Sequence, residues 1–356
     1  MRQKTLCINL GYGGGCVYYA NNLIKYLTVR KEVWISRYSE EPYENADRKL
    51  CVAGGLRSML WQTLFVLPWY VLKLNVALLM RRYDRLVVFG PHNWDCVFLF
   101  IFRIWRKKAY YVVHDGIMHA GEEDRLHQLL ITAGMRAATH HIFLSRNVQK
   151  MAVRQLGISR PSVIVPHGVI NYASGAAEVR RLSDKPCLLM IGRINYYKGI
   201  DLLEQTFPLL NFSEIGELVI AGKFAANISR PDVSVYSKVT VVDKWLSPEE
   251  FDHYVRRCDF LLMPYLEATQ SGIAAVSAGY IKPAVVSRVG AMEEQFGSAA
   301  YYIPELTPES LANTIHAAIS DPEEYIRKQE AIRHLSAELS WPALAGKLSD
   351  YLNSAQ

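Results

Sequence analysis

Two cations follow a short apolar run in the C-terminal half of the sequence. In the segment LLMIGRINYYKGIDLL, Gly192 and Arg193 come directly after a predicted strand, and Lys198 stands at the start of a predicted helix. Two cations and a helix N-terminus that meet at one loop can neutralise a diphosphate leaving group, which is what breaking a sugar–phosphate bond requires. We therefore predict that Arg193 and Lys198 stabilise a diphosphate. A pair of solvated loop cations is the alternative.

A second loop, of small polar residues, follows another predicted strand. The strand near residues 259–263 leads through Thr269, Gln270, Ser271 and Gly272 into a predicted helix. Ligands of doubly wound sheets bind beyond the carboxyl ends of the strands, so the N-terminus of this helix should point at the ligand. Hydroxyl and amide side chains beside backbone amides suit phosphate oxygens and sugar hydroxyls. We predict that these four residues bind the same phosphate-bearing ligand as the two cations.

Two adjacent acidic residues follow the turn at Val289 and Gly290. Either Glu293 or Glu294 can accept hydrogen bonds from ribose or sugar hydroxyls. A solvated helix start accounts for both residues nearly as well. Glu267 is a third acidic residue near the same loop, and the sequence alone does not choose among the three.

Glycines near the N-terminus favour a close approach of the backbone to a ligand. Gly13, Gly14 and Gly15 lie between the first predicted strand and a helix that begins near Cys16. Without a Cβ atom, backbone amides and the helix N-terminus can come close to a phosphate or a sugar. The fingerprint of nicotinamide cofactors fits poorly, because Cys16 stands where its third glycine belongs and no acidic residue clearly ends the second strand. A tight turn without a ligand is the alternative.

Histidines gather after the predicted strand near residues 109–114. His114 lies at the C-terminal tip of this strand, and Asp115 and His119 follow it. An imidazole at that place can hydrogen-bond a sugar hydroxyl or share a proton. The same side chains offer metal ligands, but their spacing matches no standard ligand set, so we predict no metal site.

Short β-branched and aromatic runs alternate with longer helix-compatible stretches, which is typical of parallel strands joined by crossover helices. The predicted strands lie near residues 4–10, 32–36, 85–89, 109–114, 140–144, 162–166, 187–191, 217–221, 239–242, 259–263, 283–287 and 300–303. Residues 167–185 lose the apolar periodicity, and the pattern restarts after them. The sequence therefore predicts an α/β chain with two doubly wound, Rossmann-like domains, residues 1–170 and 171–338, that face a cleft.

Charge is shared unequally between these two parts. The 356-residue chain has a net charge of +6, but residues 1–170 hold 23 Lys and Arg against 11 Asp and Glu, whereas residues 171–356 hold 17 against 23. A basic half is drawn to nucleic acid, to anionic lipid or to a pyrophosphate-linked substrate. The six cysteines have no spacing suited to zinc or to a redox motif, which favours reduced thiols in the cytoplasm. The N-terminus lacks a signal-peptide pattern.

Two apolar stretches in the basic half favour lipid over nucleic acid. Residues 59–80 approach the length of a transmembrane helix, yet Pro68 and Lys73 interrupt them, so we predict one surface helix in the headgroup region. Its flanking cations are Arg57, Arg81, Arg82 and Arg85. Residues 97–108 interleave aromatic with basic residues, as membrane interfaces do. The alternative is that both stretches are buried core helices.

The motifs, in their order along the chain, resemble glycosyltransferase family four, the retaining enzymes of GT-B fold. They are His114-Asp115, VIVPHG at residues 163–168, Gly192-Arg193 with Lys198-Gly199, and the run ATQSG…KP…VG…E. The resemblance extends over nearly the whole chain. It implies that Arg193 and Lys198 hold the donor pyrophosphate and that His114 lies near the transferred sugar. It also implies that Gly13 to Gly15 form an acceptor-side loop, to which we add Asp115 and His119.

One departure from the family concerns its two glutamates, which stand eight positions apart in the donor loop and helix. Thr269 and Ser277 occupy the corresponding places here, as in some polysaccharide-assembly members, which leaves Glu294 as the acidic contact. The segment LSWPALAGKLSDYL at residues 339–352 resembles the family's final helix, which often returns to pack on the first domain. We therefore join residues 339–356 to the first domain, with Trp341 as the anchor.

The residues and the resemblance together predict a retaining hexosyltransferase. It would move a sugar from a UDP- or GDP-linked donor to a lipid-linked saccharide in the synthesis of a cell-surface polysaccharide or glycolipid. It would need no metal and no cofactor besides the nucleotide-sugar co-substrate, and would work in the cytoplasm, peripherally on the inner face of the plasma membrane, without nucleic acid. The alternatives are a nucleotide-sugar epimerase, which acts without an acceptor, and an inactive membrane-bound scaffold.

Overall fold

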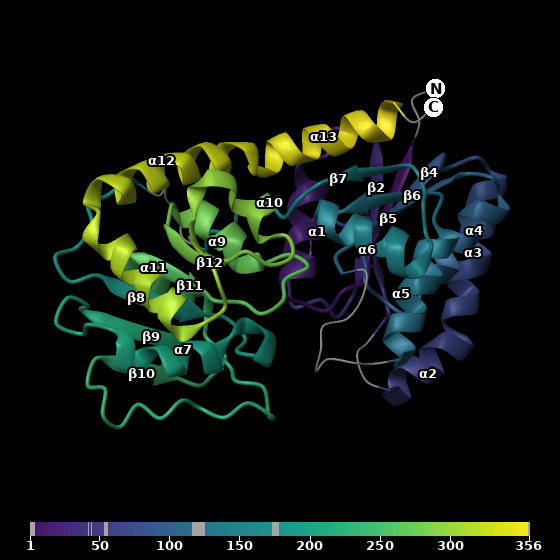
Figure 1. Ribbon diagram of the computed structural model, residues 1–356. Coiled ribbons are helices and arrows are strands. Elements are labelled where there is room, and N and C mark those ends of the chain that lie inside the picture. Colours follow the sequence, from purple (N-terminus) through teal and green to yellow (C-terminus); the bar gives the residue numbers. More distant parts are fainter. Residues whose placement is uncertain are drawn as a thin grey trace. The chain divides into compact units, whose positions relative to one another are not determined.

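The computed structural model contains two compact α/β units, each built on one parallel sheet (Figure 1). The first unit extends to His167 and takes up the C-terminal segment from Trp341, and the second extends from Gly168 to Ser340. The structure describes residues 4–41, 43, 45–52, 56–115, 125–172 and 178–354, without the side chains of residues 56, 57 and 127. His119, which the sequence predicts in the acceptor-side loop, lies outside these residues.

The sheet of the first unit is parallel throughout. Its strands are β1 (Thr5–Asn9), β2 (Lys31–Ser36), β3 (Arg48–Leu50), β4 (Arg85–Val88), β5 (Lys108–Val113), β6 (His140–Phe143) and β7 (Ser162–Ile164). They lie in the order β3-β2-β1-β4-β5-β6-β7. β1 and β4 are buried along their whole length, as strands covered by helices on both faces must be. The strand order reverses at β1 and β4, and a ligand of such a sheet binds beyond the carboxyl ends of the strands at that point.

The helices of the first unit are α1 (Gly15–Tyr26), α2 (Leu56–Phe65), α3 (Leu67–Leu79), α4 (Asp95–Ile104), α5 (Arg125–Ala137), α6 (Arg146–Leu156) and α13 (Trp341–Ser354). α4 has an apolar face at helical spacing, so that Phe98 and Phe102 are fully buried against the sheet. Phe100 and Ile104 of the same helix are exposed. The stretch at residues 97–108 thus divides into a core face and a solvent face.

The apolar stretch at residues 59–80 forms two helices, where the sequence predicts one. α2 ends at Phe65 and α3 begins at Leu67, and the pair is bent by 40°. Pro68 accounts for the break, because proline has no N–H to bond the carbonyl four residues earlier and its ring collides with that carbonyl. Among the described residues no single helix is long and apolar enough to cross a membrane, and this pair meets the criterion only when both helices are counted together.

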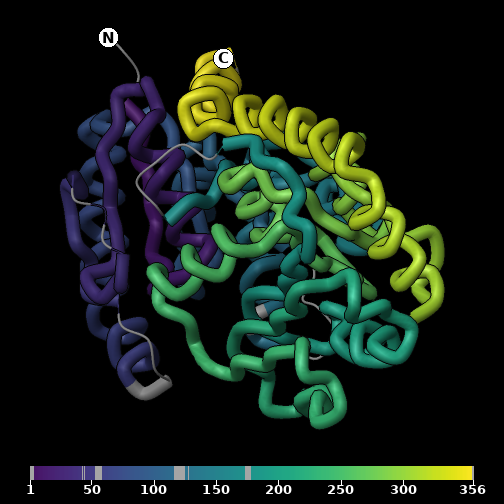
Figure 2. Tube along the Cα trace, turned by 90° about the vertical axis from the view of Figure 1, so that its left-hand side faces the viewer, coloured from purple at the N-terminus to yellow at the C-terminus, as the bar shows by residue number. Residues whose placement is uncertain are grey.

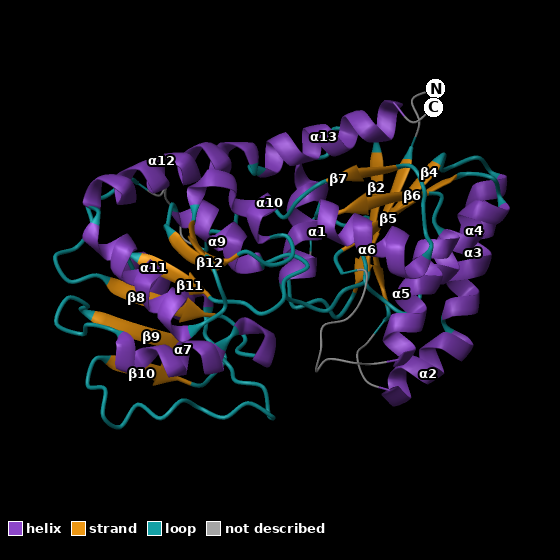
Figure 3. Cartoon of the chain, viewed as in Figure 1, coloured by secondary structure: helices purple, strands orange, loops and turns teal. Residues whose placement is uncertain are grey.

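The second unit repeats the architecture (Figure 3). Its strands are β8 (Cys187–Ile191), β9 (Glu217–Ala221), β10 (Val239–Val242), β11 (Phe260–Met263), β12 (Ala284–Ser287) and β13 (Tyr301–Ile303), in the order β10-β9-β8-β11-β12-β13. Its helices are α7 (Ile200–Thr206), α8 (Pro248–Arg257), α9 (Gly272–Tyr280), α10 (Met292–Phe296), α11 (Pro308–Ser320) and α12 (Pro322–Glu338), with short 3-10 turns at η1 (Tyr196–Lys198), η2 (Phe207–Leu209) and η3 (Gly297–Ala299). The switch in strand order falls between β8 and β11.

The C-terminal helix α13 packs on α1 within the first unit (Figures 1 and 2). The hydroxyl of Ser349 accepts a hydrogen bond from the backbone N–H of Thr28 at 3.2 Å. Arg85 is buried and donates to the carbonyl of Leu352 and, at 3.1 Å, to the side chain of Asn353. The sequence analysis was therefore wrong to place Arg85 among lipid-facing cations, because its guanidinium satisfies the orphan carbonyl end of a helix.

Candidate active site

In the second unit, the loop after β8 places a buried lysine against a glycine. Gly192 has a φ of +103°, a conformation that favours glycine. Lys198, at the end of η1, is only 8% exposed, and its Nζ would lie 3.3 Å from a Cβ atom placed on Gly192. The same Nζ lies 5.3 Å from the centroid of the Tyr265 ring. Because little water screens a buried ammonium, it attracts an anion more strongly than a surface lysine does.

Arg193 extends from the same loop and is exposed. The residue after it, Ile194, donates its backbone N–H to the carbonyl of Lys223 and accepts from the N–H of Ala225, both at 2.9 Å. These bonds fasten the loop after β8 to the loop after β9. The two predicted phosphate-binding cations therefore come from a braced segment, one cation buried and one open to solvent.

The N-terminus of α9 adjoins this lysine loop. A Cβ atom on Gly192 would lie 3.3 Å from Cδ1 of Ile273, which is in the first turn of α9. Thr269 and Ser271, in the loop that leads into the helix, are buried, and Ser271 is the N-cap residue. Gly272 is the first residue of the helix, and Gln270 is half-buried. The four predicted loop residues thus precede and begin the helix beside Gly192, as the sequence predicts for a phosphate site at a helix N-terminus.

The turn before α10 packs against the same loop. Gly290 has a φ of +55°, and a Cβ atom there would lie 1.5 Å from the carbonyl oxygen of Ala268. The N–H of Ala291 donates to that carbonyl at 3.0 Å. Glu294 of α10 is exposed, and Glu293 forms an ion pair with Arg288. The packing therefore sets Glu294 on a short helix next to the loop of residues 268–272.

The loop after β10 adds two residues that the sequence analysis missed. Asp243 accepts hydrogen bonds from the N–H of Phe224 at 3.1 Å and from the guanidinium of Arg230, and these bonds lower the pKa of Asp243 to about 2. Trp245, two residues later, is 72% exposed. An exposed indole at the carboxyl edge of the sheet is suited to stacking on a flat ring. In the sequence, a large aromatic residue shortly after a predicted strand could have indicated Trp245.

In the first unit, the glycine-rich loop joins β1 to α1. Gly14 is the N-cap residue of α1 with a φ of +79°, and a Cβ atom on Gly13 would lie 2.7 Å from a carboxylate oxygen of Glu40. The backbone conformation of Gly14 therefore disfavours a side chain, whereas the exposed Glu40 side chain next to Gly13 can move aside. Gly14 and Gly15 are exposed, so the backbone amides at the start of α1 face solvent on one side. The predicted close approach of a ligand stays a prediction.

His114 follows β5 and is buried with a defined tautomer. Its Nε2 lies 3.3 Å from the carbonyl oxygen of Phe89, so Nε2 carries the hydrogen and Nδ1 carries the lone pair. Burial lowers the pKa of His114, against the opposing charge of Asp115. At neutral pH this imidazole is therefore uncharged and can accept a hydrogen bond through Nδ1.

Asp115 lies near the first turn of α1. Burial raises the pKa of the Cys16 thiol to about 12, and the charge of Asp115 contributes to this shift. The charge of Asp115 affects the Cys16 thiol only at short range. Since Cys16 directly follows Gly15, Asp115 lies close to the start of α1, which the glycine-rich loop precedes. The structure thus gathers Gly13 to Gly15, His114 and Asp115 at one edge of the first sheet.

Helix α4, which follows the loop after β4, begins with an acidic residue that the sequence analysis missed. Asp95 is 1% exposed, and its Oδ2 accepts a hydrogen bond from the N–H of His92 at 2.7 Å. Its Oδ1 has no hydrogen-bond partner among the described residues. Burial raises the pKa of Asp95 to about 8, so the carboxyl group is largely protonated at neutral pH. In the sequence, the dipeptide Gly90-Pro91 directly after a predicted strand could have indicated this loop.

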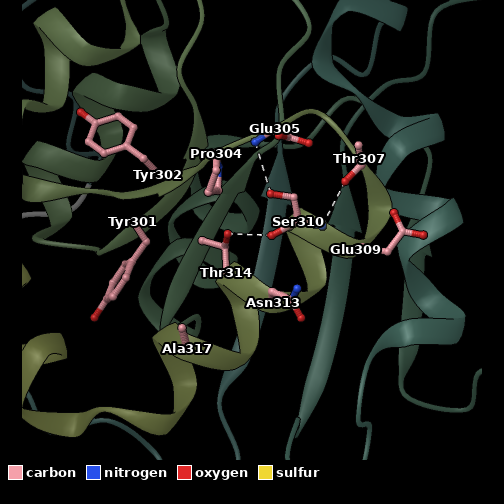
Figure 4. Close-up of a pocket in the computed structure, with 10 residues that line it drawn as sticks. All are labelled: Tyr301, Tyr302, Pro304, Glu305, Thr307, Glu309, Ser310, Asn313, Thr314 and Ala317. Carbon is pink, nitrogen blue, oxygen red and sulfur yellow. Dashed lines mark hydrogen bonds between the residues drawn. The ribbon is translucent and has the colours of Figure 1, made fainter.

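Two open cavities of the second unit lie away from these residues. One, of about 560 Å³, lies along β13 and α11 (Figure 4) and the other, of about 540 Å³, lies at the amino ends of β8 and β9. In the first, the hydroxyls of Thr307 and Ser310 take part in hydrogen bonds with the backbone of the same segment, as at a helix N-terminus. Neither cavity is lined by a predicted site residue. In the part of the chain that is described, no group of three or more His, Cys, Asp or Glu side chains could hold a metal ion.

A family model matches part of the second unit, and solved structures match the whole chain. Residues 185–321 match the model of the family Glycosyl transferases group 1. No curated protein matches the sequence. The solved sucrose-phosphate synthase from Thermosynechococcus elongatus is 16% identical, with a TM-score of 0.70 over 100% of both chains.

Two further solved structures have the same fold at low sequence identity. HepE from Anabaena, in complex with UDP, is 14% identical, with a TM-score of 0.72 over 99% of this chain and 100% of that chain. The lipopolysaccharide outer core galactosyltransferase WaaB is 12% identical, with a TM-score of 0.68 over the same shares. The matched segment and the shared two-unit architecture confirm the predicted resemblance: residues 185–321 match the glycosyl transferases group 1, and the chain as a whole has the GT-B fold of these solved glycosyltransferases.

Proposed function

We propose that the chain transfers a hexosyl group from a UDP- or GDP-linked sugar to a lipid-linked saccharide, with retention at the anomeric carbon and without a metal. The observation that carries the proposal is the buried Lys198 against Gly192, beside the N-terminus of α9. HepE, which has the same fold, was solved with UDP and with UDP-glucose. These two facts support a nucleotide-sugar donor in the second unit.

The chemistry that this site offers is stabilisation of a leaving group. When the bond between the sugar and the diphosphate breaks, negative charge collects on the departing phosphate. Lys198 would meet that charge from a nearly dry environment, Arg193 from the solvent side, and the backbone amides at Ser271 and Gly272 from the helix terminus. The departing phosphate oxygen can itself take the proton of the acceptor hydroxyl, so a separate general base is not needed.

His114 would orient the transferred sugar. Its neutral imidazole presents the Nδ1 lone pair, which accepts a hydrogen bond from a sugar hydroxyl. Glu294 would accept from a hydroxyl of the ribose or of the sugar. The glycine-rich loop and Asp115 would receive the acceptor.

The acceptor proposal draws on the surface of α2 and α3. Trp61 and Phe65 are 59% and 66% exposed, and Trp69, Leu72 and Leu79 continue this apolar surface along α3. Residues 56–83 contain no Asp or Glu, whereas Lys73 and Arg81 supply positive charge. An apolar face on helices whose charged residues are all cations suits an anionic lipid surface. We therefore propose that the chain is a peripheral enzyme on the cytoplasmic face of the plasma membrane. WaaB, which has the same fold, is a lipopolysaccharide galactosyltransferase, and this supports a lipid-linked acceptor.

The test is sugar transfer by purified variants. Arg193→Ala and Lys198→Ala should each lower kcat about 100- to 1,000-fold, the usual cost of removing one group that stabilises charge in the transition state. Arg333→Ala is the control, because Arg333 is exposed on α12 and pairs with Glu330. Near-normal turnover by both site variants would reject the assignment. Incubating the donor without an acceptor separates the rival activity, since an epimerase would still convert the donor.

A further inference from the structure

Three buried aromatic side chains of the first unit meet where the chain leaves that unit and returns to it. The chain leaves after His167 and re-enters at Trp341. The ring centroids of His167 and Trp341 are 5.5 Å apart. Tyr19 of α1 lies 5.5 Å from the ring of His167 and 5.9 Å from that of Trp341. The two crossing points and α1 therefore share one packed aromatic cluster.

Tyr19 connects this cluster to His114. The edge of one ring meets the face of the other, with centroids 5.2 Å apart and planes at 77°. The hydroxyl of Tyr19 donates to the carbonyl of Val165 at 2.9 Å, and the whole side chain is buried. A buried phenol with a single directed bond cannot rotate freely, and close packing passes its orientation to the ring beside it. The plane of His114 is thus held by Phe89 on one side and by Tyr19 on the other.

His167 connects the same cluster to the glycine-rich loop. Its Nε2 lies 3.4 Å from the carbonyl oxygen of Gly15, the first residue of α1. The proposed function places His114 and the glycine-rich loop around the reacting sugar. The segment Val165–His167 contacts the glycine-rich loop directly and is connected to His114 by Tyr19.

We propose that Tyr19 is a positioning residue, which holds His114 and the start of α1 in a geometry set by the two segments through which the chain crosses between its units. The role deepens the proposed function, since it matters for catalysis only if His114 contacts the transferred sugar. Tyr19 touches no substrate in this proposal. It acts through the imidazole ring that does.

The experiment compares Tyr19→Phe with Tyr110→Phe. The first variant keeps the ring and removes only the bond to Val165. The second removes a hydroxyl that is equally buried in the first unit but has no hydrogen-bond partner among the described residues. Tyr19→Phe should lower kcat for transfer about tenfold, the factor that one lost hydrogen bond represents, and should leave the KM for the donor unchanged. Tyr110→Phe should change neither.

A second readout does not depend on activity. The 15N signals of the His114 imidazole, assigned with His114→Gln, should shift in Tyr19→Phe and stay in place in Tyr110→Phe. Unchanged His114 signals in Tyr19→Phe would overturn the positioning role even if kcat fell. An equal loss of kcat in both variants would also overturn it. If the native chain transfers no sugar from any donor, the proposed function fails, whereas the imidazole signals still decide whether Tyr19 sets His114.

Discussion

The carboxamide of Gln295 binds both backbone groups of Ser271. Its Oε1 accepts from the Ser271 N–H at 2.8 Å, and its Nε2 donates to the Ser271 carbonyl at 3.1 Å. Ser271 is the N-cap residue of α9, but its own side chain makes no capping bond. The start of α9 is therefore fixed from α10, by a residue 24 positions further along the chain.

Gln295→Leu should weaken nucleotide binding, because it removes both bonds and leaves a buried N–H and carbonyl unsatisfied. We expect the Kd for UDP or GDP to rise at least tenfold and the free energy of unfolding to fall by about 2 kcal/mol. Isothermal titration calorimetry and urea denaturation measure the two effects. Gln149→Leu is the matched control, since Gln149 donates to Ser162 in the first unit. Equal nucleotide affinity in both variants would speak against this role of Gln295.

Asp95 should make the stability of the first unit depend on pH. Burial raises its pKa to about 8, whereas the unfolded carboxyl titrates near 4, so the folded chain holds an extra proton between these values. The stabilisation from this proton is complete below pH 4 and is lost as the pH rises towards 8, at up to about 1.4 kcal/mol per pH unit. Asp95→Asn mimics the protonated form and should flatten this slope. Denaturation curves at pH 5, 6, 7 and 8.5 compare the two, and parallel slopes would contradict the assignment.

Trp341 should contribute strongly to stability although it lies near the C-terminus. Its ring is 6% exposed and packs on Tyr18, Tyr19 and His167. Trp341→Ala should cost about 3–5 kcal/mol, the usual range for emptying a buried tryptophan site. Trp245→Ala removes a 72% exposed indole and should cost less than about 0.5 kcal/mol. Thermal unfolding of both variants checks the difference, and similar melting temperatures would show that α13 is not anchored there.

The α2–α3 surface should bind vesicles that contain anionic lipid. Trp61 and Phe65 are exposed neighbours with ring centroids 5.5 Å apart. Replacing both with serine should lower vesicle affinity at least 100-fold, because each buried aromatic side chain contributes about 1.5–3 kcal/mol. Trp245→Ser is the control for an exposed indole elsewhere. Flotation with neutral and anionic vesicles measures the bound fraction, and equal flotation of the double variant and the native chain would exclude this surface.

Most of the fold could be predicted because its elements have local signals. Each predicted strand is present, with ends displaced by no more than two residues. β3 was missed, because Arg48-Lys49-Leu50 has neither alternation nor β-branched residues, and only pairing with β2 makes it a strand. The bend at Pro68 was missed for a different reason: the proline counted only against a transmembrane helix, whereas it divides the stretch into two helices.

The site was predictable only where its residues follow strand ends. Lys198 and Ser271 stand in loops that any doubly wound sheet directs to its carboxyl edge. Gln295, Asp95 and Tyr19 act through partners that are distant in sequence or hidden in a turn, so no local pattern marks them. The burial of Lys198 and the exposure of Arg193 were equally unreadable, because both depend on packing between loops.

The rings of His167 and Trp341 touch, although 173 residues of chain lie between them, from Gly168 to Ser340. In topological terms the second unit is inserted into the first between His167 and Trp341, so that both ends of the insertion lie side by side. A domain whose two ends lie close together can be replaced by another without changing the path of the chain in the first unit. The proposed specificity for the activated sugar and the proposed attachment to a lipid surface therefore lie in separate parts of the chain, and chimaeras joined at these two residues would recombine them.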